Sequence, residues 1–343
     1  MEVADGVLQF KVPRAPNPRI PDGGLLYTLV YVVDTPQGRV LIDAGDDTDE
    51  GFRVFQRDLA EAGLAPSDIK LIVITHGHSD HAGLANRIKE MTGARLAMHR
   101  LDANGGEFFR RAGAFIENPE AARQWAHRSG IPDSEIDDEF TNRGRHGAGG
   151  HEHEARQWRR STPQVDWLLE GGEELVKGSG LWTIWTPGHS PGHVCIHDRN
   201  RRLLFSGDHI LPIITPHVTL FPGDEGNPLA LYLKAQHQVR DLDVQKVHPA
   251  HEYSFPGLRQ RVDQILEHHE ERLNEILGQV KDEPRSAYQI AAGISWNVAP
   301  WEKLNTNTRR AALMETMSHL QHLLVEGRLV RQERDEVEEY ALP

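Results

Sequence analysis

Residues 71–81 read Leu71-Ile72-Val73-Ile74-Thr75-His76-Gly77-His78-Ser79-Asp80-His81. The first four are apolar and mostly β-branched, and a Gly and a Ser follow, so the pattern predicts a buried strand that ends in a tight turn. Four side chains that can bind a metal, His76, His78, Asp80 and His81, then fall within six positions. Three imidazoles and a carboxylate are hard to satisfy in an apolar core, whereas each can donate a lone pair to a divalent cation. The stretch therefore predicts a metal site at the C-terminal end of a strand.

Histidine is abundant in this chain, with 20 among 343 residues, so chance clusters have to be weighed. The cluster His151-Glu152-His153 lies in a Gly- and Arg-rich stretch, and the pair His268-His269 lies in a charged helical pattern. The His76 cluster differs because it follows a strand and is followed by Ala82-Gly83-Leu84-Ala85, which opens a helix. We assign the metal site to the His76 cluster.

Further candidate ligands occur where other predicted strands end. One loop cannot complete the coordination shell of two ions, so residues from other strands are expected to contribute. The turn that presents the first of them is rich in Gly and Pro. These candidates are His189 after the strand-like residues 181–186, Asp208 after residues 202–207, and His251 after residues 244–247.

This order, HxHxDH followed by His, Asp and His after successive strands, resembles the metallo-β-lactamase fold superfamily of metal-dependent hydrolases. The resemblance spans about residues 20–280 and implies an α/β fold, a four-layer αββα sandwich, with two metal ions. It also implies a role for each matching residue. The first ion would be bound by His76, His78 and His189 and the second by Asp80, His81 and His251, while Asp208 would bridge both and Asp43 would support the metal loop.

The presence of both Asp80 and His81 bears on the branch of the superfamily. The chain resembles the hydroxyacylglutathione hydrolase, lactonase and ribonuclease branches, which assemble a two-metal site. The true β-lactamase branch commonly departs at these positions. Antibiotic hydrolysis is therefore not the first expectation.

Two cations about 3.5–4 Å apart lower the pKa of a shared water from about 15.7 toward 7, which generates a bridging hydroxide as nucleophile. One ion polarises the scissile carbonyl or phosphoryl oxygen. Asp208 and Asp80 are the expected catalytic residues, since a carboxylate can bridge two ions and Asp80 could accept a proton from the attacking water. Zinc is the default for imidazole-rich sites, and iron or manganese also suit a mixed His and carboxylate shell.

The amino-acid composition limits which partners and which cellular compartment are expected. The net charge of −13 argues against general attraction to nucleic acid or to anionic membranes, and favours a small-molecule substrate. The single cysteine, Cys195, excludes an internal disulfide framework. The N-terminus lacks a secretory pattern, and the early apolar run Leu25–Val33 is too short to span a bilayer. We expect a cytoplasmic protein.

Two domains are expected, a hydrolase domain over residues 1–280 and a winged-helix-like domain over residues 284–343. The second rests on a helical pattern at Thr306–Glu326 followed by a short hairpin, which resembles the module appended to some metallo-β-lactamase-fold proteins. Its arginines, such as Arg331, are offset by acidic residues such as Glu333, so the tail is not a basic nucleic-acid reader. A structural role, a homodimer contact or a wall of the substrate cleft is expected instead.

Two segments are candidates for substrate contact. An insertion at about residues 100–165 contains a helical stretch, Pro119–Ser129, and a basic cluster, Arg143–Arg160, and is expected to form a lid or a surface excursion. The apolar residues after Asp208 predict a hydrophobic wall that includes Ile213 and Phe221, with His217 as a hydrogen-bonding group.

The leading functional hypothesis is a metal-dependent hydrolase of an ester, thioester or lactone with an apolar acyl part. A two-metal phosphodiesterase or ribonuclease is the nearest alternative, because the same chemistry serves phosphoryl centres. The Arg143–Arg160 cluster could hold phosphate, although the acidic balance weighs against this alternative. A non-hydrolytic metal-binding protein is the third hypothesis.

Overall fold

A computed structural model describes residues 1–15, 25–103, 118–136 and 162–343, and these residues form two compact units. Of the described residues, the first unit contains 1–15, 25–103, 162–216 and 235–262, and the second contains 118–136, 217–234 and 263–343. The second unit thus includes more of the chain than the expected C-terminal domain at 284–343. The predicted Arg143–Arg160 cluster and His151-Glu152-His153 lie outside the described residues.

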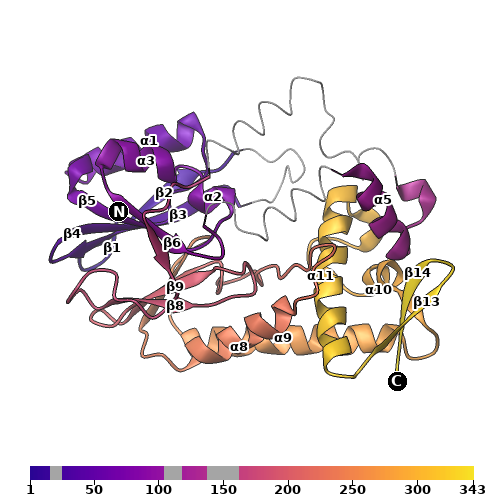
Figure 1. The fold of residues 1–343 in the computed structure, drawn as a ribbon. Coiled ribbons are helices and arrows are strands. Elements are labelled where there is room, and N and C mark those ends of the chain that lie inside the picture. Colours follow the sequence, from indigo (N-terminus) through magenta and orange to yellow (C-terminus); the bar gives the residue numbers. More distant parts are fainter. Residues whose placement is uncertain (16–24, 104–117, 137–161) are drawn as a thin grey trace. The chain divides into compact units, whose positions relative to one another are not determined.

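The first unit is built on two sheets (Figure 1). The larger sheet has its seven strands in sequence order; β1 to β4 pair antiparallel, and β4 to β7 pair parallel. The register sets Leu41 of β4 opposite Ile72 of β5, so the residues after these two strands emerge at one edge. Its strands are β1 (Glu2–Ala4), β2 (Val7–Pro13), β3 (Tyr27–Thr35), β4 (Gly38–Ile42), β5 (Ile69–Ile74), β6 (Arg95–His99) and β7 (Trp167–Leu169).

The smaller sheet has the strand order β11-β10-β9-β8. Strands β10 and β11 are parallel, with Phe205 opposite His248, so the chain leaves both strands at the same edge. A buried cluster that includes Val73 of β5 and Phe205 of β10 fills the space between the two sheets. The strands are β8 (Leu181–Trp185), β9 (Val194–Asp198), β10 (Leu203–Gly207) and β11 (Lys246–Pro249).

Helices cover the larger sheet on the face away from the smaller one. Phe55 and Leu59 of α1 (Asp49–Glu61) and Ile88 of α3 (Ala85–Thr92) are buried against Ile72 and other residues of that face. Residues 235–240 of α8 (Pro228–Arg240) and 258–262 of α9 (Leu258–Gln279) also belong to this unit. The short α2 (Ser79–Ala82) follows β5. The expected α/β sandwich is confirmed.

The second unit contains helices and a small antiparallel sheet with the order β12-β14-β13. The expected helix at Pro119–Ser129, the expected helix at Thr306–Glu326 and the hairpin after it are all present. The hairpin turn has Asp335 and Glu336 at φ 51° and 65°, as a two-residue type I′ turn requires. Residues 228–234 of α8 and 263–279 of α9 also belong to this unit. The elements that lie wholly within it include α5 (Pro119–Arg128), β12 (Arg285–Ser286), α10 (Ala287–Gly293), α11 (Thr306–Val325), β13 (Val330–Arg334) and β14 (Val337–Ala341).

Short 3-10 turns lie at Pro66–Asp68, Asp133–Glu135 and Trp301–Lys303. Within the described parts of the chain, no helix has both the length and the apolar character needed to cross a membrane.

Candidate metal centre

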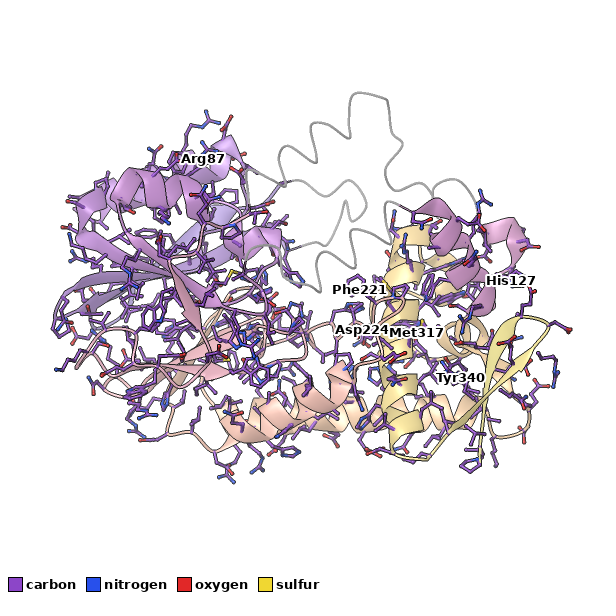
Figure 2. All side chains as sticks on the ribbon, in the orientation of Figure 1. Arg87, His127, Phe221, Asp224, Met317 and Tyr340 are labelled. Atoms are coloured by element: carbon purple, nitrogen blue, oxygen red, sulfur yellow. The ribbon has the colours of Figure 1, made fainter. Side chains whose placement is uncertain are left out.

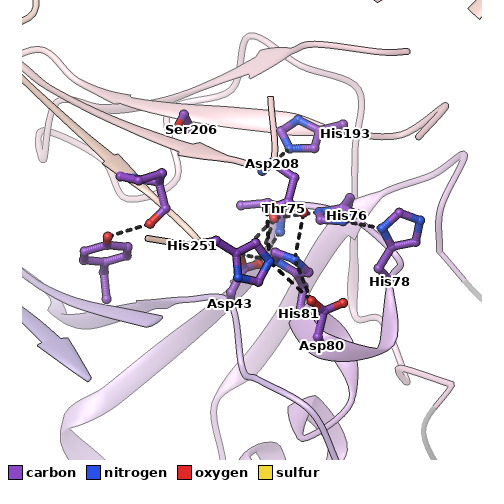
Figure 3. Close-up of polar contacts among 12 residues, drawn as sticks. Asp43, Thr75, His76, His78, Asp80, His81, His193, Ser206, Asp208 and His251 are labelled. Atoms are coloured by element: carbon purple, nitrogen blue, oxygen red, sulfur yellow. Dashed lines mark hydrogen bonds and ion pairs between the residues drawn. The ribbon is translucent and has the colours of Figure 1, made fainter. Parts of the chain in front are cut away.

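The first ligand group consists of three imidazoles that converge on one another, and Figure 3 shows two of them, His76 and His78, joined by a dashed line. His76 and His78 lie in the loop after β5, and His189 lies in the turn after β8. Nε2 of His76 is 2.8 Å from Nδ1 of His78, and Nε2 of His189 is 3.1 Å from that same Nδ1. The loop that follows β5 and the turn that follows β8 thus bring three ring nitrogens together, as a metal ligand set requires.

The second ligand group adds a carboxylate to two imidazoles. Asp80 and His81 lie on α2, and His251 follows β11. Oδ2 of Asp80 is 3.3 Å from Nε2 of His251 and 3.6 Å from Nε2 of His81. All three side chains are buried, with Asp80 8% exposed.

Asp208, which follows β10, lies between the two groups. Its Oδ2 is 3.7 Å from Nε2 of His189 in the first group and 3.4 Å from Nε2 of His81 in the second. Its Oδ1 is 3.4 Å from Nε2 of His251. One carboxylate therefore reaches both groups, which is the position that a bridging ligand would occupy.

Two buried polar atoms that lack a hydrogen-bond partner among the described residues indicate that this arrangement fits bound cations. Nε2 of His81 and Oδ1 of Asp208 are buried without a hydrogen-bond partner among the described residues. Buried polar atoms are usually hydrogen-bonded, so such a pair needs an explanation. Within each candidate group, the ligand atoms lie within 4.8 Å of one another, a spacing that one cation could share. The donor set, imidazole with carboxylate, suits zinc and also iron or manganese.

Burial and nearby charges give the histidines of the two ligand groups different protonation states. Burial lowers the pKa of His76 well below its ordinary value and lowers the pKa of His78 to about 3, helped by neighbouring histidines. These imidazoles are neutral and have lone pairs available for a metal.

The histidines of the second group behave in the opposite way. Burial would lower the pKa of His251, but the nearby carboxylates of Asp208 and Asp80 outweigh it and raise the pKa to about 9. Burial also acts against protonation of His81, yet Asp208, Asp80 and Asp43 raise its pKa well above its ordinary value. A cation that binds here must displace protons.

Asp43, directly after β4, supports the centre from behind His81. Its carboxylate accepts hydrogen bonds from the Thr75 backbone N–H at 2.8 Å and the Thr75 hydroxyl at 2.9 Å. It also lies 2.9 Å from Nδ1 of His81. This contact holds the ring by Nδ1 and leaves Nε2 directed at the ligand groups. The backbone of Asp43 has φ 60°, a left-handed conformation that is uncommon outside glycine.

Comparison with known families bears on this geometry. A family model described as the metallo-beta-lactamase superfamily matches residues 23–251, more than half of the chain. The matched range contains all seven candidate ligands. The chain belongs to the metallo-β-lactamase superfamily.

Relatives and solved structures of this superfamily differ in how much of the chain they cover. A Bacillus subtilis protein named Probable metallo-hydrolase YqjP is 23% identical over 276 residues, which are 76% of this chain and 78% of that protein. Human acyl-coenzyme A thioesterase MBLAC2 is 31% identical over 189 residues, 52% of this chain and 57% of that protein. A metallo-beta-lactamase family protein from Thermus thermophilus has a TM-score of 0.76 at 27% identity, with both chains covered completely.

Two residues that support the candidate metal centre were not predicted from the sequence. Asp102, beyond β6, accepts hydrogen bonds from the Gly77 N–H at 2.9 Å, the Gly192 N–H at 2.7 Å and the Ser190 hydroxyl at 2.6 Å. It thus ties the His76 loop to the His189 turn. The signal was its place after β6, the next parallel strand beside β5.

His193 is the second missed residue. Its Nε2 accepts a hydrogen bond from the Asp208 backbone N–H at 3.1 Å, and its Nδ1 lies 2.8 Å from the Thr186 hydroxyl. Burial keeps its pKa well below the ordinary value, so the ring is neutral, and Nε2 accepts in the tautomer that carries the proton on Nδ1. A β-carbon on Gly207 would lie 2.6 Å from this Nε2, so only glycine fits beside the ring.

The predicted substrate contacts fall in different units. Ile213 belongs to the first unit, is 62% exposed, and donates its backbone N–H to Oε2 of Glu252 at 3.0 Å. His217 belongs to the second unit, where its Nε2 lies 3.1 Å from Oε2 of Glu315. Phe221, labelled in Figure 2, belongs to that unit as well. Contact of His217 and Phe221 with substrate stays a prediction.

The histidine pair His268-His269, on α9, has an environment that differs from that of the candidate centre. His269 is buried, and its Nδ1 lies 3.0 Å from Nε2 of His319 on α11. Neither belongs to a candidate metal-ligand group among the residues that the structure describes.

Proposed function

We propose that this protein is a hydrolase that uses two divalent cations to cleave an ester, thioester or lactone with an apolar acyl part. The observation that carries the proposal is the position of Asp208, whose carboxylate oxygens reach His189 of one ligand group and His81 and His251 of the other. A single-metal site would need only one of these groups. Zinc is the first expectation, with iron or manganese as alternatives.

Bound cations would act as Lewis acids and lower the pKa of a water toward neutrality. The protein's own residues hold and orient the reacting groups. Asp80 is placed to accept the proton of the attacking water, because its carboxylate lies at the centre. Burial acts to raise its pKa, but His81, His251 and Arg14 lower it, so the carboxylate is ionised at neutral pH. Asp43 and Asp102 fix the ligand loops, so little reorganisation is needed during the reaction.

An exposed apolar surface beside the second ligand group supports an apolar acyl part. Ile213 and Ile214 are 62% and 42% exposed, and Tyr253, two residues after His251, is 53% exposed. Large apolar side chains that gather in solvent often mark a binding surface. We propose that the acyl part of the substrate lies against these side chains.

The backbone beneath this surface is held in place. The Arg261 guanidinium donates hydrogen bonds to the carbonyls of Leu211 at 2.6 Å, Ile213 at 3.0 Å and Ile214 at 2.9 Å. The exposed isoleucines therefore sit on an anchored segment, which lowers the entropic cost of binding an acyl chain.

A relative's activity favours the thioester among these bonds. The name of human MBLAC2 gives it as an acyl-coenzyme A thioesterase, and that protein shares 31% identity over 189 residues. The superfamily fold alone does not specify a substrate. We therefore rank acyl thioesters before simple esters and lactones.

A substrate panel tests the proposal. Metal-loaded protein is compared on p-nitrophenyl esters, acyl thioesters of increasing chain length, a homoserine lactone and bis-p-nitrophenyl phosphate. We expect kcat/KM for thioesters to rise up to about fourfold for each methylene that is buried, since each contributes about 0.8 kcal/mol. Turnover of the phosphodiester alone would contradict the proposal and favour a phosphodiesterase. No turnover of any substrate with two cations bound would favour a non-hydrolytic protein.

Substitution of the apolar surface separates its role from that of the centre. Ile213→Ser should flatten the chain-length dependence and leave the rate on an acetyl thioester within about twofold, because only acyl burial is lost. Val325→Ser is the matched control, since Val325 is also exposed, at 65%, and lies at the end of α11. An unchanged chain-length dependence in Ile213→Ser would remove this surface from the substrate site.

We propose that the second unit contains a winged-helix-like domain, and that the role of this domain is structural or is to form a dimer. The order β12, α10, α11, β13, β14 supports the likeness. The basic side chains of its hairpin form ion pairs. Arg331 lies 3.5 Å from Glu338, and Arg334 lies 3.5 Å from Glu339. A shift of duplex DNA by the full chain that weakens with salt would overturn this proposal.

A further inference from the structure

An arginine contacts one of the candidate ligands. Arg14 directly follows β2, and its Nη2 lies 3.2 Å from Oδ2 of Asp80. The side chain is 29% exposed, and its Nη1 donates to the Leu25 carbonyl at 3.4 Å. The next backbone N–H, of Ala15, donates to the Asp46 carboxylate at 2.9 Å and fixes the chain at this point. The guanidinium is thus held beside the second ligand group.

The arginine and the second ligand group share one oxygen atom. Oδ2 of Asp80, which Arg14 contacts, is also the atom 3.3 Å from Nε2 of His251 and 3.6 Å from Nε2 of His81. A carboxylate oxygen has two lone pairs, so it can accept an N–H and still face a cation. A permanent positive charge then remains next to any cation bound by this group.

The other candidate carboxylate has no such neighbour. In the described parts of the chain, the ion pairs of Asp208 are with His81, His189 and His251, and none is with an arginine or a lysine. The positive charge therefore acts unequally on the two groups. Like charges at this separation repel, and the repulsion is strong where water is largely excluded.

We propose that Arg14 sets the affinity of the second cation site, weakening the binding of a cation to Asp80, His81 and His251. This inference rests on the proposed two-metal function. Arg14 is a positioning residue that acts through Asp80, and its charge raises the free-cation concentration at which the centre becomes dinuclear. A centre of this kind would respond to cation availability through its second site.

Cobalt titration of the metal-free full-length protein tests the proposal. Binding is followed by visible absorption and by calorimetry in the wild type, Arg14→Gln, Arg14→Met and Arg14→Lys. The expected result is an unchanged first binding event and a second event tightened about tenfold in Arg14→Gln and Arg14→Met, because the repelling charge is gone. Arg14→Lys keeps the charge and should stay within about threefold of the wild type.

Arg39→Gln is the matched control. Arg39 is also an ion-paired arginine of the first unit, 2.7 Å from Asp34, but it lies at the start of β4, away from Asp43 at the other end of that strand. Its cobalt binding should equal that of the wild type. Thermal unfolding of each variant monitors the fold.

The possible failures are distinguishable. A wild-type protein that binds fewer than two cobalt ions would overturn both the proposed function and this inference. Two ions in the wild type, with a second event unchanged or weaker in Arg14→Gln and Arg14→Met, would overturn the inference alone. The inference would also fall if Arg14→Lys tightened the second event as much as Arg14→Gln.

Discussion

The two ligand groups of the candidate centre differ in charge. The first, His76, His78 and His189, consists of imidazoles alone, and burial lowers the pKa of the first two. The second contains the Asp80 carboxylate, and its two histidines have raised pKa values. The first group can therefore accept a cation directly, whereas the second must first release protons. Two sites joined by one carboxylate need not fill together.

Loss of the shared carboxylate should have the largest effect. Asp208→Ala removes the contact to both groups and leaves buried histidines without their counter-charge, so kcat/KM should fall by at least about 10³-fold. Turnover on an acyl thioester and metal content measure this loss. Asp243→Asn is the control, because Asp243 is an exposed acid of the same unit that pairs with Arg202. Activity within tenfold of the wild type would remove Asp208 from the centre.

Substitution within one group should affect one cation. His189→Ala and Asp80→Asn are each expected to lower kcat/KM by about 10²-fold to 10³-fold and to remove about one equivalent of bound metal, because each group loses one of its own three ligands. Metal analysis after dialysis, with circular dichroism as a check of the fold, measures both effects. If either variant kept two equivalents and the wild-type rate, that residue would not be a ligand.

The support of the first group should matter less. Asp102→Asn replaces a buried carboxylate that accepts three hydrogen bonds, so we expect a loss of about 1–3 kcal/mol in the free energy of unfolding. Cation affinity at the first site should weaken about 10-fold to 100-fold, because the two loops are no longer tied together. Chemical denaturation and cobalt titration check these two effects. An affinity loss confined to the second site would contradict the assigned role.

The pH dependence of cation affinity should differ between the two ligand groups. Because the pKa of His251 is about 9 in the cation-free protein and that of His81 is also raised, both imidazoles carry protons at pH 7.5 and lose them when a cation binds. Affinity at the second site should then fall about tenfold per pH unit for each proton as the pH drops below these values. The first site should change little over the same range, since the pKa values of His76 and His78 lie below 6.5.

Calorimetry in buffers of different ionisation enthalpy counts the released protons. We expect about two protons for the second cation and close to none for the first. Equal proton release at both sites would show that the groups do not differ in the way the structure indicates.

The sequence predicted those parts of the centre that depend on local pattern. A strand followed by a ligand loop is visible at residues 71–81, and His189, Asp208 and His251 each follow a strand, so their convergence could be expected from parallel strand ends. The helices Pro119–Ser129 and Thr306–Glu326 were also expected, because each could be recognised from a helical pattern in its own stretch of sequence. The strand pairings that bring these loops together follow from the sheet topology.

Residues that act through distant contacts could not be found in this way. Asp102 is 88 positions from Ser190, and Arg14 is 66 positions from Asp80, so no local pattern marks either pair. The division of the chain into two units could not be predicted either, since His217 and Phe221 belong to the same unit as the C-terminal helices, whereas Ile213 belongs to the other unit. Contacts of this kind depend on the tertiary fold.

Anomalous diffraction from crystals of the zinc-loaded protein, collected at the zinc edge, tests the two-metal centre most directly. We predict two peaks about 3.5–4 Å apart, one beside His76, His78 and His189, the other beside Asp80, His81 and His251, with Asp208 between them. A single peak at full zinc loading, or peaks away from these side chains, would contradict it.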